Sequence, residues 1–350
     1  MNLVSSYNQP GILFYVYCGD TDLDGTQLAG VPINTWTTFN ENTQVWYASK
    51  ESLGKKQLQS LVDHVKPDLL FINGIYSKAF TMIPLFLSNV PRKIISARGM
   101  LHPGALSQKS FKKKLWIWSW KLLGLHRRNE FHATSEEEKA YIKNIFGKDT
   151  VVFVADNYPG NFKRQLCPPK IIGEINMVSI GIVSPMKNFL FVLDTLQQCT
   201  CKIEYHIYGP VKDEAYWNKC LQQIKQLPEN IFVKYHGVIM PDQIAETLSK
   251  YHLFMLPSKS ENFGHAIYEA LSTGRPVITS KKTPWNNLEP AKAGKNISFD
   301  TADLRTAIDF FTGLNEADFQ QWSTGASDYA ASAINFHSLK NQYDSMFFLN

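Results

Sequence analysis

Short apolar runs alternate with amphipathic segments through the second half of the chain. The runs have the length of buried strands and lie at 175–182, 203–208, 231–235, 253–256, 277–279 and 297–299. Apolar residues at helical spacing fill the gaps, over 189–198, 215–226, 241–250, 263–273 and 302–311. Strands that alternate with helices in this way form βαβ units and a parallel sheet. This half therefore predicts a Rossmann-like α/β domain.

The first half shows a less regular pattern of the same kind. Strands are predicted at 12–17, 69–72, 93–97, 130–133 and 151–154, and helices at 53–66, 78–86, 108–123 and 136–146. A second Rossmann-like domain follows from this pattern. The segment 156–173 is aperiodic and holds several prolines and glycines, which is typical of a linker. We place the first domain at 1–160, the linker at 161–173, the second domain at 174–318 and C-terminal helices at 319–350.

Composition sets only broad bounds on function. The chain has 350 residues, which is enough for two separate cores, with 44% hydrophobic and 19% charged residues. A net charge of +5 permits anionic partners such as nucleotides or a phospholipid surface, and it does not require nucleic acid. The five cysteines are scattered, and no signal peptide or membrane-spanning run is visible. We expect a cytoplasmic protein, with the inner face of the cytoplasmic membrane as an open alternative.

Two carboxylates flank a loop that opens a helix in the second half. Glu261 lies in the loop, and Glu269 lies one helical turn beyond His265. The backbone N–H groups around Phe263, Gly264 and His265 are expected at the positive end of that helix, where phosphate or sugar oxygens bind well. Glu269 would suit a ribose diol, and Glu261 would accept hydrogen bonds from other hydroxyls. The alternative is a surface helix that carries glutamates for solubility.

The run Glu-Asn-Phe-Gly at 261–264, followed by Glu269, resembles the signature of the retaining nucleotide-sugar glycosyltransferases of family 4 (glycosyl transferases group 1). Gly181 to Asn188 resembles the family's diphosphate loop, in which Lys187 matches the expected lysine. Ile182 stands where the family has an arginine, so one cationic contact is missing. Residues 283–288 match a segment of bacterial polysaccharide-biosynthesis enzymes. Basic residues that could replace the missing contact are Arg275, Lys281 and Lys282.

The resemblance implies a GT-B fold, in which two Rossmann-like domains face each other across a cleft. The C-terminal helices of such proteins cross back onto the first domain. Compared with the family, we expect the first domain of this chain to lack the first strand and Gly-rich loop, either because the start is truncated or because the domain has diverged. That difference and Ile182 favour a rival hypothesis, a catalytically weakened homologue that acts as a nucleotide-binding or partner subunit.

The resemblance also assigns roles to residues of the second domain. Lys187 would bind the diphosphate, and the backbone near Val238 and Ile239 would read the base. The donor would further contact Glu261 at the sugar and Glu269 at the ribose. The donor-binding set is completed by Asn262, Phe263, Gly264 and His265. For Lys187 the alternative is a solvated loop lysine.

In the first domain, the Arg-Gly-Met segment at 98–100 resembles one branch of the family at the edge of the cleft. Arg98 would hold phosphate or the acceptor, and His102 would polarise an acceptor hydroxyl. A histidine that merely shapes the turn before Pro103 is equally open. Ser135 with Glu138 three residues later is a capping box, which we interpret as structural.

Two further segments suggest contacts with a membrane and with metal. Residues 109–128 mix lysines and arginines with Trp116, Trp118 and Trp120, as an interfacial membrane helix does. Packing of Trp116 and Trp120 into the domain is the alternative. Residues 20–25 (Asp-Thr-Asp-Leu-Asp-Gly) do not fit a calcium loop, because position 12 would be Val31. We interpret them as a polar turn and expect no metal and no cofactor.

The sequence therefore predicts a retaining hexosyltransferase-type enzyme. Its donor would be a nucleoside diphosphate sugar, and its acceptor a glycan or a polyprenol-linked glycan, in cell-surface polysaccharide or lipopolysaccharide biosynthesis. No nucleic acid partner is expected. A sugar-nucleotide epimerase would need an acid and a base around the sugar, and no such pair is apparent.

Overall fold

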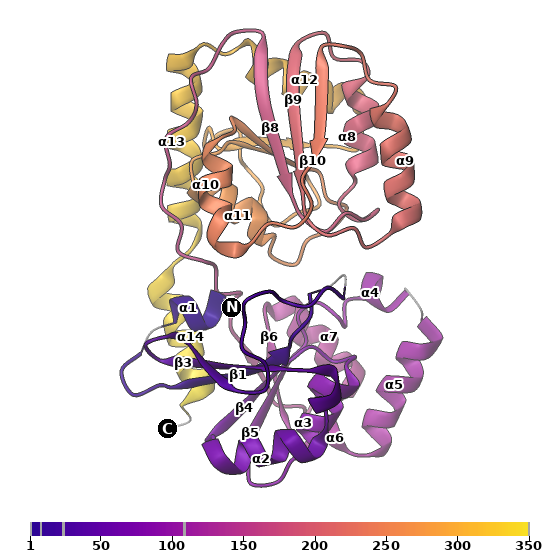
Figure 1. Ribbon diagram of the computed structural model, residues 1–350, viewed down its shortest axis with the longest axis vertical. Helices are drawn as coiled ribbons and strands as arrows, with labels where there is room; N and C mark the ends of the chain where they lie inside the picture. Colours follow the sequence, from indigo (N-terminus) through magenta and orange to yellow (C-terminus); the bar gives the residue numbers. More distant parts are fainter. Residues whose placement is uncertain (1, 8, 23–24, 108–109, 349–350) are drawn as a thin grey trace. The chain divides into compact units, whose positions relative to one another are not determined.

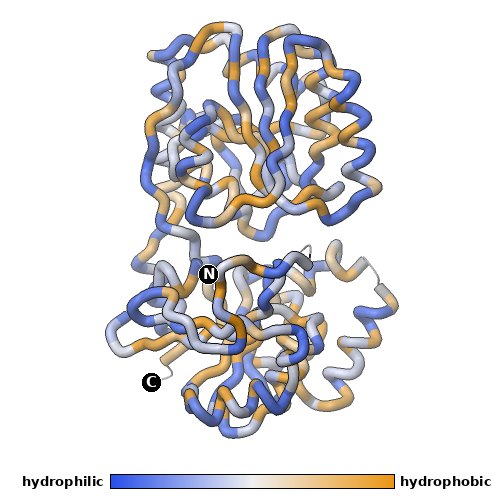
Figure 2. The backbone as a smooth tube through the Cα atoms, viewed as in Figure 1, coloured by the Kyte–Doolittle hydropathy of each residue, from blue (hydrophilic) through white to orange (hydrophobic). Residues whose placement is uncertain are grey.

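The computed structural model describes residues 2–7, 9–22, 25–107 and 110–348. The chain divides into two compact units (Figure 1). The first holds the residues up to Tyr158 together with those from Asn335 onward, and the second runs Pro159–Ile334. In both, hydrophobic and hydrophilic residues alternate in short stretches along the backbone, as the colouring of Figure 2 shows.

The second unit is built on a six-stranded parallel sheet. Its order is β10-β9-β8-β11-β12-β13. The strands are β8 (Glu174–Ile180), β9 (Lys202–Tyr208), β10 (Ile231–Tyr235), β11 (Leu253–Leu256), β12 (Val277–Ser280) and β13 (Gly294–Ile297). The parallel sheet predicted from the alternating pattern is confirmed. Only the last strand was misplaced, because Gly294 packs so closely on Val277 that an added Cβ would lie 1.9 Å from the Val277 carbonyl oxygen. A glycine at the start of a strand hides that strand from an apolar pattern.

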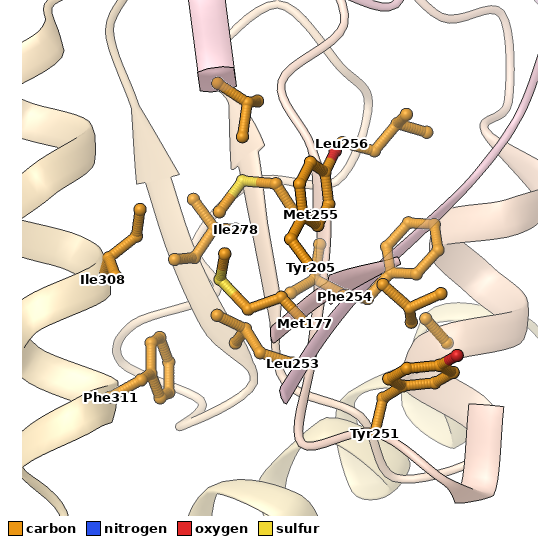
Figure 3. Close-up of a cluster of buried hydrophobic side chains, with 14 of the residues drawn as sticks. Met177, Tyr205, Tyr251, Leu253, Phe254, Met255, Leu256, Ile278, Ile308 and Phe311 are labelled. Carbon is orange, nitrogen blue, oxygen red and sulfur yellow. The ribbon is translucent and has the colours of Figure 1, made fainter. Parts of the chain in front are cut away.

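The core of this unit lies on both faces of the sheet. All four residues of β11 are buried, and Figure 3 shows Leu253, Phe254 and Met255 among side chains from neighbouring strands and from Ile308 and Phe311. Helices α8 (Phe189–Leu196), α9 (Glu214–Ile224) and α12 (Thr301–Gly313) pack together, and α10 (Ile244–Ser249), α11 (His265–Ser272) and α13 (Glu316–Ala333) form a second group. The helix predicted over 241–250 is split into η3 (Pro241–Gln243) and α10.

The first unit contains two sheets instead of one. A four-stranded parallel sheet has the order β4 (Leu69–Asn73), β5 (Arg92–Ser96), β6 (Glu130–Ala133) and β7 (Val152–Val154). The predicted strand at 12–17 is present as β1 (Phe14–Gly19), but it pairs with β3 (Thr43–Ala48) in a separate three-stranded sheet. The third strand, β2 (Trp36–Asn40), forms a hairpin with β3. The apolar pattern did not predict this hairpin, because β2 is half exposed and lacks an apolar run.

Short helices surround these sheets. They are α1 (Asn2–Ser6), η1 (Lys50–Ser52), α2 (Lys55–Val65), η2 (Lys78–Met82), α3 (Ile83–Leu85), α4 (Pro103–Ser107), α5 (Ser110–Leu122), α6 (Leu125–Arg128) and α7 (Glu136–Phe146). The start predicted for α5, at 108–109, lies outside the described residues. The η2 segment is a π-helical turn, which replaces the regular helix predicted there.

The C-terminal helix α14 (Phe336–Phe347) is part of the first unit. The guanidinium of Arg92, on β5, donates hydrogen bonds to the carbonyls of Met346 and Phe347. Tyr343 is buried and donates to the carbonyl of Asp156 at 3.1 Å. The carboxylate of Asp344 accepts from the hydroxyl of Tyr7 near the chain start. Charged, aromatic and backbone groups thus attach the chain end to this unit.

Candidate functional site

The direction of the second unit's sheet reverses between β8 and β11. From β8 the chain proceeds outward through β9 and β10, and then returns to place β11 on the other side of β8. In open parallel sheets ligands bind at the carboxyl ends of the strands, at such a switch point. The loops that follow β8 (181–188) and β11 (257–264) are the two that border it. These are the two loops that the sequence analysis selected.

Lys187 and Glu261 form an ion pair between these loops. The Lys187 side chain is 20% exposed and the Glu261 side chain is 11% exposed. The loops are also joined through the backbone, because the N–H of Lys259 donates to the carbonyl of Met186 at 2.8 Å. Within the first loop the N–H of Lys187 donates to the carbonyl of Ser184 at 3.0 Å. The structure therefore places a cation and a carboxylate together at the switch point, held from both sides.

Glycine allows the diphosphate-like loop to lie close to the end of β9. The N–H of Gly181 donates to the carbonyl of Tyr208 at 2.9 Å, and that of Val183 donates to Pro210 at 2.9 Å. Gly209 has φ of +133°, and a Cβ added there would lie 2.1 Å from the carbonyl oxygen of Gly181. A side chain at Gly209 would force the two backbones apart. Gly209 therefore sets how closely the two loops approach each other.

The amino end of α11 faces the same loops from the β11 side. Gly264 caps the helix in the left-handed region, with φ of +79°, and its carbonyl accepts from the N–H groups of Ile267 and Tyr268. The helix therefore begins at His265, two residues later than predicted. The N–H groups of a first helical turn have no intrahelical acceptor, and the helix dipole adds positive potential there. No acidic residue lies in the first turn of α11 to neutralise that potential.

Trp285, from the loop after β12, supports this helix start. Its side chain is 4% exposed and its indole N–H donates to the carbonyl of Phe263. Its Nε1 would lie 3.2 Å from a Cβ added at Gly264. Asn296 in turn donates to the Trp285 carbonyl at 2.7 Å. From the sequence this segment was only a family match, and its tryptophan was the available signal for a supporting role.

Glu269 lies inside α11 and is only 8% exposed. Burial raises the pKa of its carboxyl to about 7, and it is the sole cause of the shift. A carboxylate in this position is poorly solvated, so hydroxyl groups that donate to it would favour its ionised form. The predicted site residue is thus much more enclosed than a surface glutamate placed for solubility.

Aromatic rings gather where β9 and β10 end. The rings of Tyr208 and His236 stack with centroids 4.4 Å apart and an interplanar angle of 7°. His206 contacts His236, with 2.7 Å between Nδ1 and Nε2, and burial lowers the pKa of both histidines. Just beyond, the backbones of Val238 and Ile239 form no hydrogen bond to any described residue. Val238 and Ile239 were predicted from the family resemblance, whereas the stacked rings beside them were not.

The suggestion that Arg275 replaces the missing diphosphate contact is wrong. Arg275 is fully buried, and its guanidinium donates to the carbonyls of Leu248, Tyr251, Gln165 and Thr273. Its charge is therefore satisfied by backbone carbonyls in the interior and does not reach a ligand. Lys281 and Lys282 are exposed after β12. Two exposed lysines were overlooked: Lys259, in the second loop, and Lys212, whose N–H donates to the carbonyl of Val183 beside Ile182.

Arg98 and His102 lie in the first unit, in the turn after β5. Arg98 has φ of +50° and donates from Nη1 to Asn157 Oδ1 at 2.6 Å. His102 is exposed, and its Nδ1 accepts from the N–H of Gly104 at 3.0 Å. The neutral ring therefore carries its proton on Nε2, which can donate to a hydroxyl but cannot accept a proton from it. The turn-shaping role suggested for His102 is present in the structure.

Glu138 holds this turn in place. It is 4% exposed and accepts from the backbone N–H of Gly99 at 2.5 Å and from the N–H and hydroxyl of Thr134, both at 2.7 Å. Ser135 caps α7 as predicted, by accepting from the N–H of Glu138. The second half of the predicted capping box is wrong, because the Glu138 carboxylate bonds to Gly99 and Thr134. Sequence spacing gave no signal for the link to Gly99.

The aspartate-rich turn at 20–25 is described only in part, since Leu23 and Asp24 lie outside the described residues. Asp20 is 7% exposed and accepts from the side chain of Gln27 at 3.2 Å. Among the residues that the structure describes, no three His, Cys, Asp or Glu side chains gather as a metal site requires.

Comparison with known proteins identifies the second unit most clearly. Residues 170–296 match the family model described as Glycosyl transferases group 1, and this stretch includes both loops and α11. No curated protein matches the chain in sequence.

Solved structures resemble the chain over most of its length. HepE of Anabaena, in complex with UDP and glucose, is 17% identical with a TM-score of 0.63, over 87% of this chain and 85% of that one. Sucrose-phosphate synthase from Thermosynechococcus elongatus is 15% identical with a TM-score of 0.70, over 99% and 90%. WaaG, a glycosyltransferase involved in lipopolysaccharide biosynthesis, is 11% identical with a TM-score of 0.61, over 97% and 100%. The predicted fold class, α/β with two Rossmann-like domains of the GT-B type, is confirmed.

Proposed function

We propose that this protein, whose GT-B fold carries a glycosyl transferases group 1 region, transfers a sugar from a nucleoside diphosphate sugar to an acceptor hydroxyl. The observation that carries the proposal is the Lys187–Glu261 ion pair at the switch point, beside the amino end of α11. A cation, a carboxylate and a positive helix end in one place match the parts of such a donor. The diphosphate is anionic and the sugar offers hydroxyl donors.

Donor binding would exchange one ion pair for two new contacts. The Lys187 ammonium would move from Glu261 to the diphosphate, and the Glu261 carboxylate would accept hydrogen bonds from sugar hydroxyls. The first-turn N–H groups of α11 would bind sugar or phosphate oxygens, with Asn262, Phe263, Gly264 and His265 forming that surface. Because both charges gain a partner as they lose one, neither is left uncompensated in a half-buried position.

The remaining parts of the donor fit the flanking residues. The ribose diol would donate to Glu269, and the base would lie along the backbone of Val238 and Ile239. The stacked rings of Tyr208 and His236 lie at the end of the neighbouring strands and offer an aromatic surface to the base. HepE, which shares the fold, was solved with UDP and glucose bound, and a uridine nucleotide is therefore the first donor to test.

Rate enhancement would come from charge stabilisation and positioning. The bond between the sugar carbon and the diphosphate oxygen breaks, and a bond to the acceptor oxygen forms on the same face of the sugar. The proton that the acceptor hydroxyl loses would pass to the leaving diphosphate oxygen on that face. Negative charge develops on the leaving diphosphate, where Lys187 and the helix end stabilise it. Lys212 or Lys259 would supply the second cation that Ile182 removes. The proposal includes retention of configuration, a hexose donor and independence of metal.

The acceptor side rests on the first unit. Arg98 would hold an acceptor phosphate or glycan, and the Nε2–H of His102 would orient an acceptor hydroxyl. A glycan or polyprenol-linked acceptor in the assembly of cell-surface polysaccharide is the class we favour, because Arg98 suits the phosphate of a lipid-linked carrier. WaaG, with the same fold, is involved in lipopolysaccharide biosynthesis.

One observation favours a second candidate function. Ile182 is half buried where the family's arginine would stand, so the chain could bind a nucleotide without turning it over. Such a protein would be a nucleotide-binding or partner subunit.

Donor hydrolysis and nucleotide binding, measured together, separate the two candidates. The purified chain is incubated with a panel of UDP-, GDP- and ADP-sugars, and nucleotide release is compared with that of Lys187→Ala and Glu261→Ala. Turnover that both variants abolish supports the enzyme. Binding without turnover of any donor supports the binding subunit, and the absence of both would overturn the two proposals.

A further inference from the structure

Helix α5 of the first unit exposes a stripe of large apolar side chains. Phe111, Leu115, Trp118 and Leu122 are 80%, 55%, 57% and 68% exposed. Their spacing places all four on one face of the 13-residue helix. Side chains of this size are seldom left in water as a continuous row on a protein that acts alone. The stripe therefore marks a contact surface.

The opposite face of α5 fixes how the stripe is oriented. Trp120 is fully buried, and the indole N–H of Trp116 donates to the carbonyl of Ile75 at 2.8 Å. Trp116 and Trp120 thus pack into the unit, which was the alternative to membrane contact that the sequence left open for these two residues. Trp118 points away from them, because residues two apart on a helix lie on different sides. The helix is locked onto its unit by one face and presents the other outward.

Lysines border the stripe on both sides. Lys112 lies along one edge, Lys114 and Lys121 lie along the other, and all three are exposed. Arg127 and Arg128 of α6 are exposed as well. Residues 69–129 contain eleven Lys and Arg residues and not a single Asp or Glu, although the excess over the whole chain is only five. Positive charge is therefore concentrated around this helix.

We infer that α5 lies flat on an anionic phospholipid surface. Its apolar stripe would enter the boundary between head groups and acyl chains, while the lysines would extend their ammonium groups to lipid phosphates. Among the described residues no helix combines the length and hydrophobicity needed to cross a bilayer. Because one face of α5 is packed against the unit, only its outer face can enter the lipid, which makes the contact an interfacial one.

The charges argue against a second copy of this chain as the partner. A symmetric dimer through α5 would bring Lys112, Lys114 and Lys121 of both copies together, with no carboxylate in the surrounding segment to separate them. Like charges facing each other across an interface oppose association. An anionic lipid surface satisfies both the apolar stripe and its basic border. This inference does not depend on the proposed glycosyltransferase activity.

Vesicle sedimentation of the full chain tests the inference. We expect the protein to bind vesicles of equal parts phosphatidylcholine and phosphatidylglycerol, and to bind pure phosphatidylcholine vesicles much more weakly. The double variant Phe111→Ser with Trp118→Ser should lower partition at least about tenfold, since two large apolar side chains no longer enter the bilayer. The matched control is Leu166→Ser with Phe232→Ser, which removes two other exposed apolar side chains, of 91% and 54% exposure, and should bind normally.

The role of the α5 lysines is tested by comparing two triple variants that have the same net charge. Lys112→Glu, Lys114→Glu and Lys121→Glu combined should abolish binding to the anionic vesicles. Reversal of three exposed lysines elsewhere, Lys56→Glu, Lys148→Glu and Lys219→Glu, should leave most of it. Equal losses in both triple variants would overturn a local basic surface.

A measurement on the unaltered chain completes the test. Lipids with brominated acyl chains should quench part of the tryptophan fluorescence, and Trp118→Phe should remove that part. Quenching that persists in Trp118→Phe contradicts the proposed orientation. Sedimentation that does not require vesicles, or a dimer that the Phe111 and Trp118 double variant converts to a monomer, would instead identify self-association. Donor hydrolysis without vesicles should be unchanged in all α5 variants, so that a failure here is distinct from a failure of the enzyme.

Discussion

Lys187 and Glu261 lie 74 positions apart in the chain and meet as an ion pair between the loops that follow adjacent parallel strands. Each is mostly withdrawn from water, so removal of one leaves the other charge poorly compensated. The same contact can therefore be structural, catalytic or both. Its two roles predict different results when both partners are replaced.

We expect Lys187→Ala to lower the rate of donor turnover by roughly a hundredfold to a thousandfold, the usual cost of a donor aimed at a developing charge. Glu261→Ala should lower it to a similar degree and should weaken the affinity for the sugar nucleotide more than that for the free nucleotide. Steady-state kinetics with isothermal titration of the nucleotide measure both effects.

The double variant Lys187→Met with Glu261→Gln is the control. It removes both charges, so the free energy of unfolding should lie closer to that of the wild type than in either single variant. Turnover should stay as low as in Lys187→Ala. Recovery of turnover together with stability would mean that the ion pair acts only in the fold.

Glu269 predicts opposite pH trends for stability and for nucleotide binding. Burial raises the pKa of its carboxyl in the folded chain from 4.5 to about 7. Between these pH values the unfolded chain has lost a proton that the folded chain retains, so this group's contribution to stability falls as the pH rises and is constant above about pH 7. Glu269→Gln should therefore raise the free energy of unfolding at pH 8, by at most about 3 kcal/mol.

Ribose hydroxyls that donate to Glu269 favour its ionised form, so nucleotide affinity should rise with pH up to about pH 7. In Glu269→Gln the affinity should be weaker and should no longer follow this trend. Chemical denaturation and nucleotide titration at pH 6 and pH 8 provide the measurements, with the exposed Glu214→Gln as the matched control. A wild-type affinity that does not change with pH would argue against the contact with ribose.

The α/β architecture could be predicted from the sequence because strands such as β11 are wholly apolar and are followed by amphipathic helices. The β2–β3 hairpin could not, because Trp36 to Asn40 alternates weakly and remains half exposed. The short strand β13 was shifted because it begins at Gly294 and has no apolar run at its start. Local pattern is informative where burial is complete and fails where an element is only partly covered.

Residues of the candidate site were easier to select than their contacts. The loops with Lys187 and Glu261 were chosen from motifs, but their pairing depends on the reversal of strand order between β8 and β11. Arg275 was predicted to bind the ligand because it is a charged residue close in sequence to the site. In the structure its guanidinium lies in the interior and donates to four backbone carbonyls. Glu138 was assigned to its own helix, although its strongest contacts lie outside it. Such tertiary contacts leave no mark in local spacing.

Replacement of Gly264 by alanine should weaken nucleotide binding by more than the strain of a left-handed alanine alone explains. Alanine in the left-handed region costs about 1 kcal/mol at any position. At Gly264 the added Cβ would also lie 3.2 Å from the Trp285 ring nitrogen and disturb the helix start. We expect Gly264→Ala to weaken nucleotide affinity at least about tenfold, which corresponds to 1.4 kcal/mol.

Gly173→Ala separates the two effects. Gly173 has φ of +87° with nothing near the position of an added Cβ, so the variant carries the conformational cost alone. Its stability should fall by about 1 kcal/mol while its nucleotide affinity stays normal. Equal affinities of the two variants would exclude the helix start as part of the binding surface.

Glu138 predicts that acceptor transfer can be impaired without loss of donor binding. Both carboxylate oxygens accept hydrogen bonds, from Gly99 on one side and from Thr134 on the other. In Glu138→Gln one of these oxygens becomes an NH2 group that faces an N–H donor, so we expect a loss of about 2–3 kcal/mol in the stability of the first unit. The turn that carries Arg98 loses its anchor at Gly99. Transfer to an acceptor should therefore fall, whereas nucleotide affinity, which depends on the second unit, should remain.

Glu136→Gln is the control. Glu136 is exposed in the first turn of the same helix, so its replacement should change neither acceptor transfer nor nucleotide affinity. A parallel loss of nucleotide affinity in Glu138→Gln would mean that the first unit does not act on the acceptor alone.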